Sequence, residues 1–336
     1  MSNHLTRGAL RRKSRLESDT REITQMTNRT LTYSLLAAVL LSALIFVGCG
    51  GTGDPVIYQN VAEQPSWSDD GRIAFASYGG DGLLYIYRID DDGSNQHLLT
   101  PTTGEGGRHP SFSPDGQQIA ISSRRGDATP LIYLIDAEEG DRETLRAVTA
   151  DTGQGADFAP SFHPDGERIV YTSTRENAAG DIRIINTDGT GDTALLATAA
   201  AERWGTVSPD GNWLAYQSDE GGATNIWRLD LTDPGATPVQ LTDTPYRDEA
   251  PSWSPDGSQI AFHSDRQGIF DIFIMDADGG NQVAVTGNEH SDGFPVFDPG
   301  NGRLAIVRER VLWTIPALPW GEWTFDNDGE RLTRRR

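Results

Sequence analysis

One pattern of apolar and polar residues recurs six times along the chain. Each copy has a short stretch around an aromatic residue or valine, then Ser-Pro-Asp-Gly or a variant of it, then a run rich in isoleucine, alanine and aromatic residues. Proline presets φ at the second position of a turn, and glycine takes a positive φ without steric cost, so the polar tetrapeptide predicts a tight turn between two strands. The copies begin 44 to 50 residues apart, at Pro65, Pro110, Pro160, Gly205, Pro251 and Pro295.

Two further strands are predicted after the hairpin of each copy. The third strand is expected at Tyr85–Asp90, Leu131–Asp136, Asp181–Asn186, Asn225–Asp230, Asp271–Asp276 and Val311–Ile315. The fourth strand, after a turn rich in Asp and Gly, is expected at Gln96–Thr100, Arg146–Thr149, Ala194–Thr198, Val239–Thr242 and Gln282–Thr286. Four strands in a repeat of this length predict an all-β chain, a six-bladed β-propeller of four-stranded antiparallel blades.

The fourth strand of the last blade has two candidates. One is Glu330–Thr333, near the C-terminus, and the other is the N-terminal segment Val56–Gln59. Pairing of the N-terminal segment across the chain ends would remove a free sheet edge. The residue pattern leaves this choice open.

The repeat also supports a resemblance to a known family. Its PSWSPDGxxIAF…DIFIMDADG…LT pattern closely resembles the repeats of the TolB-type propellers, and it covers nearly all of the chain from Pro65 onward. The same repeat type occurs in prolyl-oligopeptidase-like peptidases and in some oligogalacturonide lyases, so the resemblance implies the fold far more specifically than the function. TolB carries an α/β domain before its propeller, whereas here only Cys49–Gln64 separate the expected processed N-terminus from the first repeat.

The N-terminal region indicates export. Leu35–Val47 is an apolar run of 13 residues, which is too short to span a bilayer and is typical of the core of a signal peptide. The run leads into Phe46-Val47-Gly48-Cys49, which resembles the cleavage site of bacterial lipoproteins. We therefore expect cleavage after Gly48 and lipid on Cys49. An ordinary secretory signal and an uncleaved anchor are the alternatives.

These features divide the chain into three predicted parts. Residues 1–48 are a signal peptide, residues 49–64 a lipid-anchored linker with the possible closing strand, and residues 65–336 the propeller. Met26 is a candidate for the true start, because it gives a signal peptide of ordinary proportions; a long cytoplasmic segment is the alternative. Gly50 stands after the cysteine in place of aspartate, so we expect a cell-envelope protein on the periplasmic face of the outer membrane.

Acidic residues dominate the predicted mature chain. The whole sequence has a net charge of −21, and without residues 1–48, which hold 7 of the 28 basic and 3 of the 49 acidic residues, the net charge is −25. Proteins bind phosphate backbones through clustered Lys and Arg, so we expect no nucleic acid partner. Membrane contact is expected only through the lipid on Cys49.

Several enzyme classes lack the residues that they need. Lys13 is the only lysine, so the mature chain offers no Schiff-base lysine and no GxxxxGK[ST] phosphate loop. Cys49 is the only cysteine, and neither HExxH nor G-x-S-x-G occurs, so no intramolecular disulfide, zinc site or nucleophile elbow is predicted. We therefore assign no catalytic residues.

Histidine provides the one metal-dependent alternative. His109 and His290 each precede the first strand of a blade, near one end of the central channel, where the related oligogalacturonide lyases use a histidine cluster with a divalent metal. Two histidines from non-adjacent blades fall short of that cluster, so we assign no metal ligands and no cofactor. Calcium is the cation that carboxylates and carbonyl oxygens of an acidic chain would favour.

The segments that lead into each first strand vary, whereas the rest of the repeat is nearly constant. In a propeller these loops surround one end of the channel, and loops on a rigid scaffold commonly carry function. Aromatic and arginine side chains dominate binding energy at interfaces. The predicted partner-binding residues at this channel mouth are Arg108, His109, Asp157, Phe158, Arg203, Trp204, Arg247, Asp248, Asp292 and Phe294.

Two function classes follow from these residues. The favoured hypothesis is a non-catalytic, monomeric, lipid-anchored adaptor or scaffold that binds an envelope protein or peptide, as the resemblance to TolB implies. Arginines at the mouth would pair with carboxylates, and aromatic rings would provide apolar contact. The second hypothesis is a carbohydrate-binding or metal-dependent polysaccharide-lyase-like propeller that uses the same mouth. The simplest alternative to both is a set of solvated loops with local ion pairs.

Overall fold

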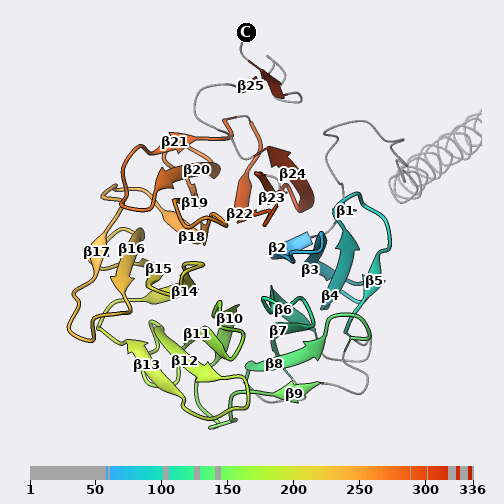
Figure 1. The fold of residues 1–336 in the computed structure, drawn as a ribbon, viewed down its shortest axis with the longest axis vertical. Coiled ribbons are helices and arrows are strands. Elements are labelled where there is room, and N and C mark those ends of the chain that lie inside the picture. Colours follow the sequence, from blue (N-terminus) through green and yellow to red (C-terminus); the bar gives the residue numbers. More distant parts are fainter. Residues whose placement is uncertain are drawn as a thin grey trace, which may run out of the picture. The chain divides into compact units, whose positions relative to one another are not determined.

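Six antiparallel sheets of four strands each surround a central channel (Figure 1). The computed structural model describes residues 58–59, 61–100, 106–124, 129–140, 145–287, 289–300, 302–316, 323–325 and 332–334. This arrangement confirms the predicted six-bladed β-propeller. In the described part of the chain, no helix is long and apolar enough to cross a membrane.

The strands of each blade run in order from the channel to the outside, except in the last blade. The innermost strands are β2 (Val61–Trp67), β6 (Gly107–Phe112), β10 (Asp157–Phe162), β14 (Glu202–Val207), β18 (Asp248–Trp253) and β22 (Asp292–Phe297). The second strands are β3 (Arg72–Tyr78), β7 (Gln118–Ser123), β11 (Arg168–Ser173), β15 (Trp213–Ser218), β19 (Gln259–Ser264) and β23 (Arg303–Arg308).

The two outer strands of each blade differ in length. The third strands are β4 (Leu84–Asp90), β8 (Leu131–Asp136), β12 (Asp181–Asn186), β16 (Asn225–Asp230), β20 (Asp271–Asp276) and β24 (Val311–Pro316). The fourth strands are β5 (His97–Leu98), β9 (Arg146–Ala147), β13 (Thr193–Leu196), β17 (Val239–Gln240) and β21 (Val283–Ala284), with β1 (Tyr58–Gln59) in the last blade.

The fourth strands are shorter than the sequence predicts, because a threonine side chain replaces part of the backbone ladder. In blade 4 the backbone N–H of Ile226, in the third strand, donates to Thr242 Oγ1 at 3.0 Å. In blade 5 the N–H of Ile272 donates to Thr286 Oγ1 at 2.9 Å. The chain therefore leaves the sheet at this threonine, and regular pairing ends two residues earlier than the apolar pattern indicates.

The N-terminal strand closes the ring. β1 pairs antiparallel with β24, with Tyr58 opposite Leu312 and Gln59 opposite Val311, and so provides the fourth strand of blade 6. The C-terminal candidate for this position, Glu330–Thr333, was wrong. Its described residues belong to β26 (Leu332–Arg334), which pairs with β25 (Trp323–Phe325) in a separate hairpin. Val56, the start of the N-terminal candidate, lies outside the described residues.

The hydrophobic core lies between blades, where small residues of one sheet face large residues of the next. In β3 the side chain of Ala74 packs with blade 2, whereas Ile73 and Phe75 pack with blade 6. In β23 Ala305 likewise packs with blade 1, and Leu304 packs with blade 5. This alternation explains why both faces of the second strand are apolar, as expected for a strand buried on both sides. It also seals the junction between the first and last blades.

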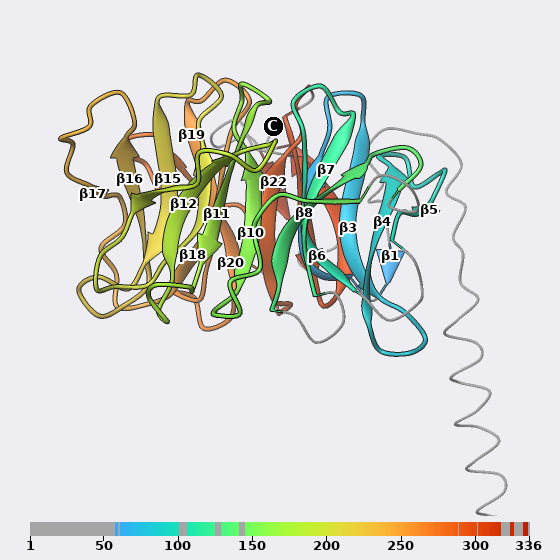
Figure 2. The same cartoon turned by 90° about the horizontal axis from the view of Figure 1, so that it is seen from below.

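The Ser-Pro-Asp-Gly turns all lie at one end of the propeller, which we call the turn end. In blade 5, Ser254 Oγ donates to Asp256 Oδ1 at 2.7 Å and accepts the backbone N–H of Gln259 at 2.9 Å. Gly257 has φ = 71°, a conformation that costs glycine little. Each first strand begins and each second strand ends at the opposite end, which we call the mouth end (Figure 2).

Candidate binding face at the channel mouth

Exposed apolar side chains gather at the mouth end. Six large apolar side chains are exposed among the described residues. Two of them, Val239 and Val283, lie in the short outer strands β17 and β21. The other four lie in or beside loops at the mouth end: Tyr78, Leu83, Tyr246 and Ile269. Tyr78 and Leu83 belong to blade 1, and Tyr246 and Ile269 to blade 5. We call these four residues the apolar rim, because exposed apolar surface concentrated at one end of a protein marks a candidate interaction site.

A β-bulge lies near the start of every first strand. In β14 the register with β15 shifts between Arg203 and Thr206, and Trp204 at the bulge has φ = 57°. A left-handed conformation costs a residue with a Cβ about 1–2 kcal/mol, so surrounding contacts must hold it in place. The equivalent residues of four other blades adopt the same conformation: His109, Ala159, Ala250 and Phe294.

Side chains of the preceding blade hold these bulges. The backbone N–H of Trp204 donates to Thr172 Oγ1 at 3.1 Å, and that of Ala250 donates to Gln217 Oε1 at 3.0 Å. The N–H of Phe294 donates to His263 Nδ1 at 3.1 Å. Each bond joins two blades, so the bulges at the mouth are fixed relative to one another before any partner binds.

The bulges bring four of the predicted aromatic and histidine side chains together. The Trp204 ring from blade 4 lies 4.9 Å, centroid to centroid, from the His109 ring of blade 2 and 5.7 Å from the Phe294 ring of blade 6. Phe158 of blade 3 lies 6.3 Å from His109. His109, Trp204 and Phe294 come from blades 2, 4 and 6, no two of which are adjacent, so Trp204 reaches across the channel. We call Trp204, His109, Phe158 and Phe294 the aromatic cluster.

A polar cavity lies in the channel beside the aromatic cluster. It has a volume of about 110 Å³ and is lined by residues of all six blades, including Trp204. Hydroxyl side chains contribute from five blades: Ser66, Ser111, Ser161, Thr206 and Ser252. Ser66 Oγ accepts the backbone N–H of Phe112 at 2.9 Å, so this ring of hydroxyls also joins blades. The space suffices for several water molecules.

The predicted acidic residues of the mouth are buried within their blades. Asp157, Asp248 and Asp292 are each 0% exposed. Their nearest arginine nitrogens lie 3.0 Å away in Arg175, 2.9 Å in Arg266 and 2.6 Å in Arg308. Carboxylates buried to this degree offer no surface to a partner, and they tie the start of the first strand to the end of the second.

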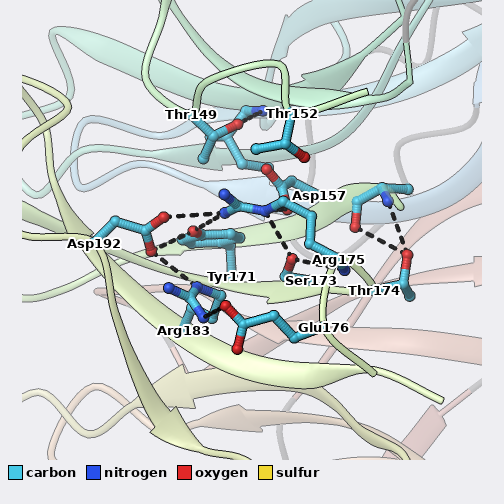
Figure 3. Close-up of polar contacts among 12 residues, drawn as sticks. Thr149, Thr152, Asp157, Tyr171, Ser173, Thr174, Arg175, Glu176, Arg183 and Asp192 are labelled. Atoms are coloured by element: carbon cyan, nitrogen blue, oxygen red, sulfur yellow. Dashed lines mark hydrogen bonds and ion pairs between the residues drawn. The ribbon is translucent and has the colours of Figure 1, made fainter. Parts of the chain in front are cut away.

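The network around Asp157 shows how these acids are held (Figure 3). Arg175 bonds Asp157 through Nε and reaches both the Tyr171 hydroxyl, at 2.5 Å, and Asp192, at 3.1 Å. Arg183 donates to the other oxygen of Asp192 at 2.9 Å. Burial nevertheless raises the pKa of Asp157, because desolvation of its carboxylate outweighs the hydrogen bonds and the arginine charge. Burial also raises the pKa of Glu202, the equivalent acid of blade 4.

The three predicted arginines have different environments. Arg108 is exposed. Arg203 is half-buried and donates through Nε to the carbonyl oxygen of Ala179 at 2.7 Å, which links blades 3 and 4. Arg247 keeps 56% of its side chain exposed, pairs with Asp265 at 2.9 Å and lies over the Phe270 ring, 4.5 Å from its centroid. Arg108 and Arg247 are therefore exposed at the mouth, whereas Arg203 is half-buried and bonds the neighbouring blade.

The comparisons with known proteins agree on one fold. No protein-family model matches the chain. An uncharacterized protein of Agrobacterium fabrum is 28% identical over 257 residues, which are 73% of this chain and 84% of that protein. TolB from Acinetobacter baumannii has a TM-score of 0.61 at 23% identity, and a putative TolB from Agrobacterium tumefaciens has a TM-score of 0.56 at 24% identity. The chain has a TolB-type propeller fold.

The match to the TolB structures is partial. It covers 73% of this chain and 57% of the A. baumannii TolB, and 69% of this chain and 89% of the A. tumefaciens protein. This TolB-type propeller therefore spans less than two thirds of the A. baumannii TolB. At this level of identity the likeness establishes the fold alone.

Enzymes also share the TolB-type propeller. An oligogalacturonate lyase solved in complex with manganese has a TM-score of 0.52 at 16% identity, over 79% of this chain and 91% of the lyase. His109 is buried in the aromatic cluster, whereas His290 is exposed beside Glu309. Within the described ranges no three His, Cys, Asp or Glu side chains converge in a group that could hold a metal ion.

Some mouth residues were missed by the sequence analysis. By strand register, Glu249 is the equivalent of Arg108 and Arg203, and it lies 3.4 Å from His263 Nε2. Arg108 stands two residues before Pro110, and Glu249 stands two residues before the equivalent Pro251, so alignment of the repeats would have identified it. Tyr78 and Leu83 were missed because loops between second and third strands were not considered. Cys49 lies outside the described residues.

Proposed function

We propose that the protein is a non-catalytic, lipid-anchored TolB-like adaptor of the bacterial cell envelope, which binds a protein or peptide at the channel mouth. The observation that carries this proposal is the grouping of Tyr78, Leu83, Tyr246 and Ile269 at the mouth end. Arg108 and Arg247 add exposed positive charge to this apolar rim. Aromatic and arginine side chains are the types that contribute most to protein interfaces.

The aromatic cluster determines how deeply a partner would enter. Trp204 spans the channel between His109 and Phe294, so an extended segment would lie across the mouth and contact these rings rather than thread through the channel. The bulges are held by hydrogen bonds between blades. A site that is ordered before binding reduces the entropy lost on association.

The lipid on Cys49 would hold this face near a membrane. Cys49 precedes Tyr58, the first residue of the closing strand, by nine positions. A fully extended connection of that length reaches about 30 Å. The proposed anchor would therefore keep the propeller, as a monomer, within reach of partners at the same membrane.

Capture of partners from solubilised envelope tests the binding proposal. One variant changes Tyr78, Leu83, Tyr246 and Ile269 to serine, and a matched control changes Val239 and Val283, which are equally apolar and exposed but lie in outer strands. We expect a specific protein to bind the native chain and the control but not the mouth variant. Equal capture by all three, with melting temperatures unchanged, would refute binding at the mouth.

Labelling with a radioactive fatty acid tests the anchor separately. The native chain is expected to incorporate the label and to sediment with membranes, whereas Cys49→Ser is expected to lose both properties. Equal labelling of the two chains would refute lipidation of Cys49.

A further inference from the structure

A groove of about 530 Å³ lies at the mouth end of blades 1, 2 and 3. Tyr78 and Leu83 contribute from blade 1, Arg108 and Arg124 from blade 2, and Phe158 from blade 3. Tyr78, Leu83 and both arginines are exposed, and Phe158 is half-buried where it meets the aromatic cluster. The groove therefore runs from the outer rim to the centre of the mouth.

The groove combines positive charge with apolar surface in a strongly acidic protein. The chain has a net charge of −21, yet Arg108 and Arg124 both line this one groove. Arg310 of blade 6 adds a third charge, because its guanidinium lies 5.6 Å from the centroid of the Tyr78 ring. The nearby carboxylate of Asp81 is occupied within its own loop, since it accepts the Tyr85 hydroxyl at 2.5 Å and the Leu83 N–H at 3.0 Å.

A strained turn positions Arg310 beside Tyr78. Glu309 and Arg310 alone join β23 to β24, and both have positive φ, 48° and 65°. In blades 1 to 5 the second and third strands are separated by longer loops. Two consecutive non-glycine residues in this conformation are costly, and such strain concentrates at functional sites.

We propose that this groove binds an extended acidic peptide segment of the partner. Its carboxylates pair with Arg108 and Arg124, and an apolar side chain between them packs against Tyr78, Leu83 and Phe158. Arginine recognises carboxylates through paired, charge-assisted hydrogen bonds, which suits both sites. The exposed aliphatic Leu83 favours a peptide over an acidic glycan, because it offers no hydrogen-bonding group to sugar hydroxyls and no ring on which a sugar could stack. The proposal rests on the proposed function and specifies the chemistry of the partner.

Fluorescence anisotropy with the purified protein and three labelled probes tests the proposal. The first probe is a hexapeptide that alternates glutamate with leucine and phenylalanine, the second has glutamine at each glutamate, and the third is oligogalacturonate. We expect the glutamate peptide to bind about tenfold more tightly than the glutamine peptide, since a charged pair adds that much to a neutral contact. Salt is expected to reduce this preference.

Two variants locate the preference. The double variant Arg108→Gln and Arg124→Gln is expected to lose most of the preference for the glutamate peptide, whereas Arg168→Gln, whose side chain is 43% exposed at the turn end, is expected to keep the native ratio. Tight binding of oligogalacturonate alone, equal binding of both peptides by the native chain, or no peptide binding up to about 1 mM would each overturn the proposal.

The proposed function fails in a different way. One outcome refutes the groove proposal alone: the double variant still captures the partner from solubilised envelope, and the variant of Tyr78, Leu83, Tyr246 and Ile269 does not. The mouth-binding adaptor then stands. If neither variant changes capture, both proposals are refuted.

Discussion

At the turn end of the propeller, serine and aspartate side chains bond the backbone of their own turn, whereas at the mouth end side chains of one blade bond the bulge of the next. Ser254 and Asp256 organise one local hairpin at the turn end. Thr172 and His263 at the mouth end each hold a bulge of the following blade. The hairpins of the turn end therefore depend on local interactions that repeat from blade to blade, whereas the bulges of the mouth end depend on contacts between blades.

The two ends also differ in what they expose. The turns repeat Ser, Asp and Gly with little variation, so this end presents similar polar groups around the ring. The mouth end carries different residues in each blade, and four exposed apolar side chains lie there. A repeat protein separates two requirements in this way: one end keeps the sequence that each hairpin needs, and the other end is free to vary for recognition.

Two tryptophans provide the strongest contrast between the ends. Trp253, just before a turn, is 7% exposed in the core between blades 4 and 5, and its Nε1 donates to the carbonyl oxygen of Thr206 at 3.2 Å. We expect Trp253→Ala to lower the free energy of unfolding by about 3–5 kcal/mol. Trp204→Ala is expected to cost less than half as much, because that ring is half-buried and its backbone is strained. Urea unfolding measures both, and equal losses would contradict a recognition role for Trp204.

The second-largest effect on the free energy of unfolding is expected for the buried carboxylates of the mouth end. Asp292→Ala leaves Arg308, whose side chain is only 8% exposed, without its partner carboxylate. We expect a loss of about 3 kcal/mol in the free energy of unfolding, as for other broken buried ion pairs. The control Arg247→Ala breaks an exposed pair and is expected to cost no more than about 1 kcal/mol. A control as damaging as Asp292→Ala would show that burial does not distinguish these pairs.

Substitutions at residues with positive φ are expected to give a smaller difference in stability between the two ends. Gly257 at the turn end has φ = 71°, and a Cβ added there would lie 3.6 Å from Pro209, so Gly257→Ala costs only conformational strain, about 1–2 kcal/mol. Ala250 at the mouth end has φ = 51°, so Ala250→Gly is expected to change stability by less than about 1 kcal/mol, because relief of strain offsets the added chain entropy. Thermal unfolding of both variants tests this, and destabilisation of both by the same amount would contradict it.

The smallest expected difference between the two ends is in how their carboxyl groups make stability depend on pH. Burial raises the pKa of Asp157, Glu202 and Asp271 at the mouth end. In the folded state these groups bind protons more readily than in the unfolded chain, so their contribution to stability increases as the pH falls through their raised pKa values toward 4.

Turn-end carboxylates have the opposite dependence. Hydrogen bonds from Ser113 and Ser208 lower the pKa of Asp115 and Asp210 below the ordinary 3.8. Their contribution is complete above that pH and is lost as the pH falls through the lowered values. Asp210→Asn is therefore expected to flatten the stability profile only below about pH 4. Carboxyl titrations by NMR check both directions, and a raised pKa for Asp115 would contradict the contrast.

The sequence predicted the third strands well because their signals are local. The third strands that begin at Leu131, Asp181, Asn225 and Asp271 match the predicted bounds. Each is a six-residue, largely apolar segment that ends at Asp or Asn, so its limits are visible in the sequence. The fourth strands were overestimated, because the role of a threonine such as Thr242 in replacing the ladder is not visible in hydrophobic periodicity. Ring closure by Tyr58–Gln59 required the structure, because pairing between distant segments leaves no local pattern.

The candidate site was predicted only in outline. The variable segments did mark the mouth, and Trp204, Phe158 and Phe294 do meet there. Charge alone could not tell that Asp248 faces inward to Arg266 whereas Arg247, one residue earlier, faces solvent. The inward direction of Asp248 depends on Arg266, which follows the second strand of the same blade and lies 18 residues away in the sequence.

Closure of the ring by β1 also has a mechanical consequence. In the described part of the chain, the N-terminal strand joins blade 6 through two residue pairs, Tyr58 with Leu312 and Gln59 with Val311. If Cys49 carries a lipid, any force between membrane and partner passes through this short pairing before it reaches the core between blades. The outer edge of blade 6 would then peel first, while its three inner strands and the other five blades keep their shape under load.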